Sequence, residues 1–279
     1  MNTHGNKCAC MIGKFARGRM HFTVLCAAAL TLVLISGGCG GGAPDVLAVD
    51  SGVTRDYLVK CAGGYLLIDT GYEKHYDDFL AGLGRLGIAP GQVRWVLLTH
   101  HHDDHSGFAG RLLRESGASL IVHEKAYPFL AQGKPELLMK PLNWCTEAAF
   151  TVFAALFKKD KDHGFPPVPR RANDRIVKGD DGELLKSLGV NGTILHTPGH
   201  TDDSISVVLA NGSAFVGDCA MDMLAACACA HRPIYANDYA QVYESWKKLV
   251  SGGAKMIYPS HGGAFGAGEL ESTMRDKPL

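Results

Sequence analysis

A cluster of histidines and aspartates in the first half of the chain constrains its structure and chemistry most. Four of the thirteen histidines lie within six residues, in the sequence Thr-His-His-His-Asp-Asp-His-Ser-Gly at residues 99–107. Imidazole and carboxylate suit a divalent metal such as zinc, and side chains two apart in an extended segment project to the same side. His100 and His102 are therefore expected to bind one ion. Asp104 and His105, displaced along the turn, are available for a second.

The surroundings of this cluster place it on a loop between a strand and a helix. Residues 93–98 form an apolar run typical of a buried strand, and residues 107–116 predict a short helix. Functional side chains usually lie on such loops. A solvated loop with incidental histidines is the alternative, but matching motifs elsewhere in the chain argue against it.

Four further motifs accompany the cluster. Leu-Leu-Ile-Asp-Thr-Gly at residues 66–71 precedes it; Thr-Pro-Gly-His-Thr at 197–201, Val-Gly-Asp at 216–218 and Pro-Ser-His-Gly at 259–262 follow it. With the His-x-His-x-Asp-His cluster, this ordered series resembles the metallo-β-lactamase-fold superfamily, over nearly all of residues 45–265.

The resemblance implies a fold and a set of metal ligands. The fold is α/β, a four-layer αββα sandwich with the metal site along one edge of the paired sheets. The site is expected to hold two zinc ions, with iron or manganese as other candidates. Its ligands are His100, His102 and His200 for the first metal, Asp104, His105 and His261 for the second, and Asp218 as the bridge. Asp69 is expected to position a ligand or loop by hydrogen bonds.

Two zinc ions predict a hydrolase. Each lowers the pKa of a bound water and acts as a Lewis acid on a carbonyl oxygen. We expect a metal-bridging hydroxide, oriented by the catalytic Asp104, to attack a small-molecule ester, thioester or lactone.

The choice of substrate depends on two adjacent residues, Asp218 and Cys219. In β-lactamases with a cysteine in the second site a thiolate occupies this position, whereas glyoxalase-II-like hydrolases and lactonases carry an aspartate. Asp218 is favoured because it follows Gly217 at the strand end, as in the aspartate-type members. A metallo-β-lactamase acting on β-lactam antibiotics is the alternative, and an iron-dependent oxidoreductase on the same fold is a minority alternative.

Other histidines of the chain are not expected to bind metal. His101 and the neighbouring Asp103 occupy variable motif positions and are predicted to face away, so replacing His101 should have little effect. His123, His196 and His231 are expected to be structural or exposed.

The remaining sequence predicts alternating strands and helices, which fits a layered α/β domain. Besides the segments around the cluster, we expect strands at 46–49, 53–60, 65–69, 119–122, 193–196, 205–209, 214–216 and 255–258, and helices at 76–86 and 239–250.

A helical insert is predicted around residues 124–170. Residues 148–157 are apolar except for Thr151, and prolines at 166, 167 and 169 then break the chain. Candidates for an apolar substrate wall are Trp144, Phe150, Phe153 and Phe157, with packing against the core as the alternative for each.

Residues 1–44 are expected to form a leader ahead of a catalytic domain at 45–279. Four basic residues precede an uncharged stretch at 22–35, and small residues surround Cys39. This layout is typical of a signal peptide or a lipoprotein signal followed by a glycine-rich linker, with Cys39 as the point of membrane attachment. The protein is expected to be exported, as a periplasmic or membrane-anchored lipoprotein, or to be cytoplasmic if the start is wrongly chosen.

Charge and cysteine content add two expectations. Lys plus Arg and Asp plus Glu are equal at 28 each, which gives no electrostatic case for binding nucleic acid. Five cysteines lie beyond the leader, at 61, 145, 219, 227 and 229. Their odd number and irregular spacing imply no disulfide framework, and buried, inert thiols are expected. The oligomeric state is left open.

Overall fold

The computed structural model describes residues 46–136, 139–156 and 163–278. The predicted leader with Cys39, and the side chains of Phe153 and Phe157, lie outside the described part of the chain. None of the described helices is both long and apolar enough to span a bilayer.

The first sheet has six strands in the order β1-β2-β3-β4-β5-β7. β1, β2 and β3 pair antiparallel, and β3, β4, β5 and β7 pair parallel. Their bounds are Val46–Ser51 (β1), Thr54–Cys61 (β2), Gly64–Ile68 (β3), Val93–Leu97 (β4), Ser119–His123 (β5) and Arg175–Val177 (β7).

The second sheet has five strands in the order β13-β12-β10-β9-β8. β10 and β12 are parallel, and the other pairs are antiparallel, so that β8, β10 and β12 all run in one direction. Their bounds are Gly192–His196 (β8), Ile205–Leu209 (β9), Ser213–Gly217 (β10), Met256–Pro259 (β12) and Phe265–Gly266 (β13).

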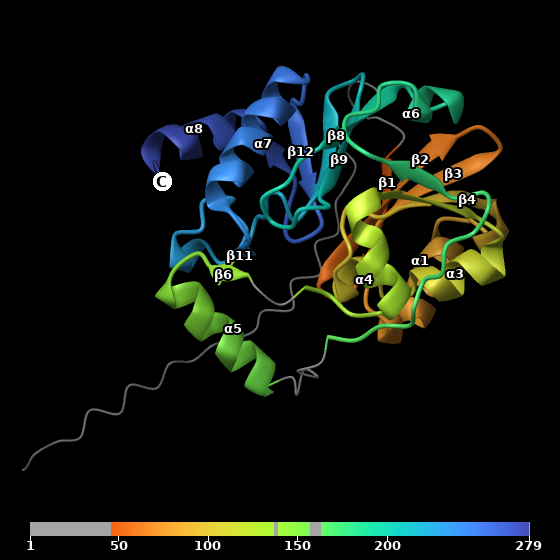
Figure 1. Ribbon diagram of the computed structural model, residues 1–279, viewed down its shortest axis with the longest axis horizontal. Helices are drawn as coiled ribbons and strands as arrows, with labels where there is room; N and C mark the ends of the chain where they lie inside the picture. Colours follow the sequence, from red (N-terminus) through yellow and green to blue (C-terminus); the bar gives the residue numbers. More distant parts are fainter. Residues whose placement is uncertain (1–45, 137–138, 157–162, 279) are drawn as a thin grey trace, which may run out of the picture. The chain divides into compact units, whose positions relative to one another are not determined.

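Helices cover the outer face of each sheet (Figure 1). The helices on the first sheet are α1 (Tyr76–Arg85), α3 (Ala109–Ser116) and α4 (Tyr127–Gln132); those on the second are α7 (Tyr239–Ser251) and α8 (Gly268–Asp276). The chain also has the short helices α2 (Asp103–Ser106) and α6 (Leu184–Ser187). Its 3-10 turns lie at Glu73–His75, Pro90–Gln92, Glu124–Ala126 and Ala225–Cys227.

Alternating side chains along the strands build three apolar layers. In β3, Leu67 packs under the helices of the first sheet, whereas Leu66 and Ile68 face the second sheet. In β10, Phe215 joins the layer between the sheets, and its neighbours Ala214 and Val216 pack under α7 and α8. This period of two is the pattern of strands buried on both faces. The predicted αββα sandwich is confirmed.

The predicted elements agree with the structure except at a few places. The helix expected at 107–116 is α3, which begins at Ala109. The sequence analysis did not predict α2, α6 and α8 or the strands β6 (Lys140–Pro141), β7, β11 (Tyr235–Ala236) and β13. In the insert, helix α5 spans Trp144–Leu156 and begins four residues before its apolar stretch. Asn143 explains this start, because its Oδ1 accepts hydrogen bonds from the backbone N–H groups of Cys145 and Thr146.

A disulfide joins Cys145 at the start of α5 to Cys227 in the loop after β10. The expectation that the cysteines beyond the leader are all free thiols is therefore wrong for this pair. The two residues are 82 positions apart in the sequence, and their Cα atoms are 5.4 Å apart in the fold. Beside the disulfide, β6 (Lys140–Pro141) pairs with β11 (Tyr235–Ala236). The disulfide and the β6–β11 strand pair therefore connect the insert to the loop at two places.

Candidate metal centre

The five sequence motifs all lie at strand ends. The first covers the end of β3 and the second follows β4, and the carboxyl ends of these parallel strands lie at the same edge of the first sheet. The other three follow β8, β10 and β12, which run in one direction in the second sheet. The site is therefore assembled from loops of both sheets.

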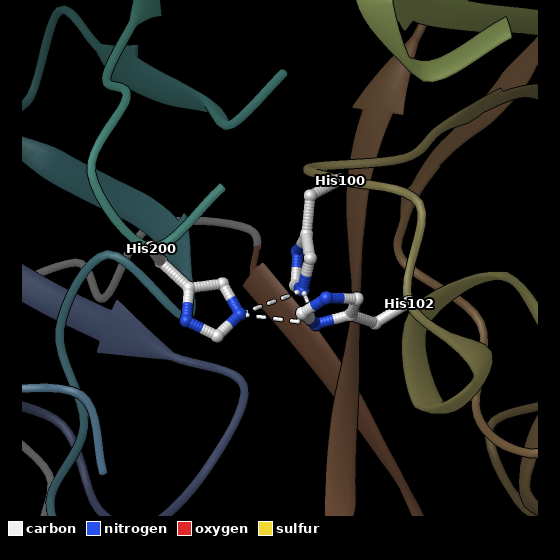
Figure 2. A group of neighbouring side chains, drawn as sticks. All are labelled: His100, His102 and His200. Atoms are coloured by element: carbon white, nitrogen blue, oxygen red, sulfur yellow. Dashed lines mark hydrogen bonds between the residues drawn. The ribbon is translucent and has the colours of Figure 1, made fainter. Parts of the chain in front are cut away.

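Three histidine nitrogens form the first ligand group (Figure 2). His100 and His102 come from the loop after β4, and His200 comes from the loop after β8. Nε2 of His100 lies 3.0 Å from Nδ1 of His102, and Nε2 of His200 lies 3.2 Å and 3.1 Å from these two atoms. A tetrahedral zinc ion with Zn–N distances of about 2.05 Å holds its nitrogen ligands about 3.3 Å apart, so the triangle fits such an ion.

The second ligand group consists of Asp104, His105 and His261. Oδ2 of Asp104 lies 3.4 Å from Nε2 of His261, and Oδ1 lies 3.7 Å from Nε2 of His105. One carboxylate and two imidazoles are a donor set that zinc accepts.

Asp218 lies between the two groups. Its Oδ1 is 3.2 Å from Nε2 of His105 and 3.4 Å from Nε2 of His261. Its Oδ2 is 3.5 Å from Nε2 of His200. One carboxylate thus contacts both groups, which is the placement required of a bridge. The structure brings all seven predicted ligands into one cluster.

Backbone carbonyls orient two of these imidazoles. Nδ1 of His200 lies 2.9 Å from the carbonyl oxygen of Tyr235, and Nδ1 of His261 lies 3.0 Å from that of Val53. A carbonyl oxygen only accepts, so Nδ1 carries the proton and donates it. Each Nε2 is then left with a lone pair directed into the cluster, as a metal requires.

Asp69 orients the loops around the cluster. Its carboxylate accepts from the backbone N–H of Thr99 at 2.7 Å, from the hydroxyls of Thr99 and Ser260 at 2.8 and 3.0 Å, and from Nδ1 of His105 at 2.9 Å. It does so from a left-handed backbone conformation with φ of 64°. Asp69 lies outside the ligand group and connects three of the five motifs, which is the positioning role predicted for it.

Close packing also fixes the end of β10. Gly217 has φ of 51°, and a side chain at this position would collide with the side chain of Thr99. Only glycine allows the chain to turn there and place Asp218 against the loop of the first sheet.

Electrostatics leaves the first group neutral and the bridge ionised. Burial, together with the neighbouring histidines, lowers the pKa values of His100 and His102 well below the ordinary value, and burial lowers that of His200. Burial opposes ionisation of Asp218, but His261 and His105 outweigh it and lower the pKa of this carboxyl. Neutral imidazoles and an ionised carboxylate are the forms that bind metal.

Two atoms of the cluster lie 3.2 Å apart but make no hydrogen bond with each other or with any other described residue. They are Nε2 of His105 and Oδ1 of Asp218, both fully buried. Buried polar atoms are nearly always paired, because leaving one unpaired costs about 1–3 kcal/mol. A divalent cation would satisfy both atoms, so the residues present fit a metal.

Cys219 is not part of the cluster. Its side chain is fully buried in the apolar layer under α7 and α8, beside Ala220 and Trp246. Burial raises the pKa of its thiol to about 12, which disfavours the thiolate that a metal would need. Of the two adjacent candidates, the geometry favours Asp218.

His101 faces away from the cluster, as predicted, but its side chain makes several buried contacts of its own. Its Nδ1 donates to Oδ1 of Asp203 at 2.8 Å, its Nε2 accepts from the backbone N–H of Glu136 at 3.0 Å, and its ring stacks on Phe129. The side chain is fully buried. That replacing His101 has little effect on turnover and metal content stays a prediction, whereas these three buried contacts lead us to expect an effect on stability.

The other histidines lie outside the cluster. His123 and His196 stack on each other with ring centroids 4.3 Å apart, and His231 contacts Glu269 at 3.0 Å. Asp103 directs its carboxylate toward Nδ1 of His163 at 3.3 Å, and both residues line the cavity in front of the cluster. Asp103 therefore belongs to the wall of the site, and the prediction that it faces away is wrong.

This cavity has a volume of about 330 Å³ and contacts ligands of both metal groups. Phe150 lines it as predicted, whereas Trp144 is 81% exposed and lies outside the lining. The other apolar lining residues include Met139, Met221, Met223, Leu224 and Ile234, which no sequence pattern indicated. Tyr72 was also missed, and its hydroxyl lies 3.4 Å from Oδ2 of Asp104.

Comparisons with known proteins agree with this geometry. Residues 50–261 match the model of the metallo-beta-lactamase superfamily. A lactamase-like protein of Pestalotiopsis microspora is 25% identical over 212 residues, covering 75% of this chain and 49% of the relative. An atrochrysone carboxyl ACP thioesterase of Aspergillus aculeatus is 24% identical, covering 75% and 50%. The chain thus spans about half the length of these relatives.

Solved structures share the fold. A metallo-beta-lactamase family protein from Thermus thermophilus superposes with a TM-score of 0.59 at 23% identity, over 83% of this chain and 79% of that chain. The Rm3 metallo-beta-lactamase gives a TM-score of 0.55 at 20% identity, over 78% and 76%. With five ordered motifs, a four-layer sandwich and a seven-residue cluster at the edge of its sheets, this chain belongs to the metallo-beta-lactamase superfamily.

Proposed function

We propose that this chain is a dinuclear zinc-dependent hydrolase that attacks the carbonyl of an ester, thioester or lactone. The family, and relatives that carry the names thioesterase and lactamase-like protein, support a hydrolase. The observation that carries the finer proposal is Asp218, whose carboxylate contacts both ligand groups while Cys219 is buried in the core.

The chemistry of such a site divides between the metals and the protein. Two zinc ions bound there would lower the pKa of a water molecule and polarise the carbonyl of the substrate. Asp104 lies at the cavity wall, where its carboxylate can accept a hydrogen bond from the attacking water and orient it. Asp69 does not contact the substrate in this proposal; it positions His105 and the loops that carry the ligands by hydrogen bonds.

A substrate panel tests this function. The zinc-loaded full-length chain is assayed with lactones, thioesters, carboxylic esters, aryl phosphates and β-lactams. We expect turnover of at least one of the first three classes, loss of turnover with a chelator, and recovery with zinc. Turnover of β-lactams alone would support a β-lactamase instead. Iron with a visible absorption band in protein purified without added metal would indicate an oxidoreductase.

We also propose that the protein is exported and anchored through Cys39. The disulfide between Cys145 and Cys227 supports export, because disulfides persist in oxidising compartments. Cell fractionation compares the full chain with Cys39→Ala: the wild type should be in the membrane fraction and the variant should be released. Both proteins in the cytosol with intact first residues would contradict export and anchoring.

A further inference from the structure

The lining of the cavity points to the class of substrate. We infer that the group flanking the scissile carbonyl is apolar and uncharged, such as an alkyl chain, and that anionic groups at this position are rejected. This inference rests on the proposed hydrolase function.

The cavity that the metal ligands line also has apolar lining residues, which we call its apolar side. Three separate segments supply it: Met139 beside β6, Phe150 on α5, and Met223, Leu224 and Ile234 from the loop between β10 and β11. Thioether side chains adapt their shape to an apolar partner. The free energy falls when an alkyl group displaces water from apolar surface. This side therefore favours hydrocarbon.

Apart from histidines, the charged side chains among the described lining residues are all carboxylates. Beyond the ligands Asp104 and Asp218, the described lining contains the carboxylates of Asp103 and Glu136. No lysine or arginine is among the described lining residues. A carboxylate or phosphate placed against the apolar side would lose its hydration and find no cation there, which is a costly arrangement.

The segments that form the apolar side are fixed to each other in the absence of substrate. The disulfide between Cys145 and Cys227 ties α5 to the loop, and Nδ2 of Asn143 donates to the carbonyl oxygen of Cys227 at 3.0 Å. The ring of Phe150 packs edge-on against Tyr235, with centroids 5.2 Å apart. A preformed wall spends little of the binding free energy on ordering, so its chemical character decides which substrates bind.

Matched substrates test the inference on the zinc-loaded full chain. p-Nitrophenyl pentanoate and mono-p-nitrophenyl glutarate have the same number of carbons in the acyl chain and differ in a terminal carboxylate. We expect kcat/KM for the pentanoate to exceed that for p-nitrophenyl acetate, which has a shorter acyl chain, by about 10-fold, since each buried methylene favours binding. The glutarate should fall below the pentanoate by on the order of 100-fold, because its charge is buried unpaired.

A lysine in the wall should reverse this preference. Ile234→Lys is expected to lower kcat/KM for the pentanoate and raise it for the glutarate. Val152→Lys is the matched control, because Val152 lies on the same insert helix as Phe150 but is 57% exposed and outside the cavity lining. It should change neither value. Zinc content and melting temperature are measured for each variant, and Met223→Lys replaces Ile234→Lys if the latter fails to fold.

Binding without turnover separates the two proposals. Pentanohydroxamic acid and glutaric monohydroxamic acid, which share a metal-binding head, are titrated into the zinc-loaded protein by calorimetry. Tighter binding of the uncharged compound supports the inference even if no ester is hydrolysed, a result that would contradict only the hydrolase function. Equal or tighter binding of the carboxylated compound, or equal kcat/KM for pentanoate and glutarate, would overturn the inference while leaving hydrolysis intact.

Discussion

The metal cluster and the apolar wall line one cavity but are built differently. The cluster lies on loops at the strand ends of two large sheets, and the hydrogen bonds that its imidazoles donate to Asp69 and to backbone carbonyls orient them. The wall comes from an insert helix and a loop, joined by a disulfide and by two-residue strands. We therefore infer that the sheets position the metal ligands and that the insert and the loop select the substrate.

Removing a ligand should have the largest effect. His200→Ala opens the first ligand group, so we expect zinc content to fall and kcat/KM to drop by more than about 100-fold, beyond the loss typical of an outer partner. His196→Ala is the matched control: it lies four residues earlier, stacks on His123 and is outside the cluster. Equal losses in the two variants would mean that the cluster is not the metal site.

Removing the group that orients the ligands should have the next largest effect. Asp69→Asn keeps the size of the side chain, but its amide nitrogen cannot accept the hydrogen bonds that Thr99, His105 and Ser260 donate. Zinc affinity should fall by about 10–100-fold, measured by competition with a chelator.

Cys219→Ser is the control for that variant and for the bridge. Because Cys219 lies in the core, the serine variant should retain zinc and most activity, whereas Asp218→Ala should lose the second metal preferentially. The opposite result would move the bridge from Asp218 to Cys219.

Replacing His101 should affect folding rather than chemistry. His101→Ala leaves Asp203 buried without this partner, and the free energy of unfolding should fall by about 3 kcal/mol. An unchanged urea midpoint would show that the contact contributes nothing.

The same pair predicts a dependence of stability on pH. Burial alone would raise the pKa of Asp203, but the contact with His101 and the hydrogen bond from Thr201 lower it below the ordinary 3.8. The unfolded chain therefore binds the proton first as the pH falls. The stabilisation should be complete above the ordinary pKa and be lost below it, so the stability difference between wild type and Asp203→Asn should shrink from about pH 5 to about pH 3.

Breaking the disulfide should have the smallest effect on the cluster and a selective effect on the wall. In the Cys145→Ser, Cys227→Ser double variant, KM for the pentanoate ester should rise while kcat/KM for the acetate and the zinc content stay near wild type. Thermal unfolding should begin at a lower temperature, since the bridge closes a long loop. Loss of zinc in this variant would show that the two regions are not independent.

The same contrast explains what the sequence could predict. Every ligand follows a strand end within a short motif, and the resemblance carried by these ordered motifs was enough to place His100, His200 and Asp218 in one cluster. The alternation of predicted strands and helices along the chain likewise predicted a layered α/β domain.

Contacts between distant segments could not be predicted in this way. Cys145 and Cys227 are 82 residues apart, and no local pattern pairs them. Met139 and Met223 resemble any other apolar residues until the insert meets the loop at the cavity. His101 occupies a variable position in its motif, and only the fold reveals Asp203 as its partner.

Metal stoichiometry tests the central claim most directly. The full chain is saturated with zinc, and unbound zinc is removed. The zinc bound per chain is then measured by inductively coupled plasma mass spectrometry for the wild type, for Asp218→Ala and for the control His196→Ala. We predict two zinc ions per chain for the wild type and for His196→Ala, and fewer for Asp218→Ala, with hydrolysis falling in parallel. A wild type that holds no zinc, or an Asp218→Ala variant that keeps both ions and full activity, would contradict a two-metal centre built on this carboxylate.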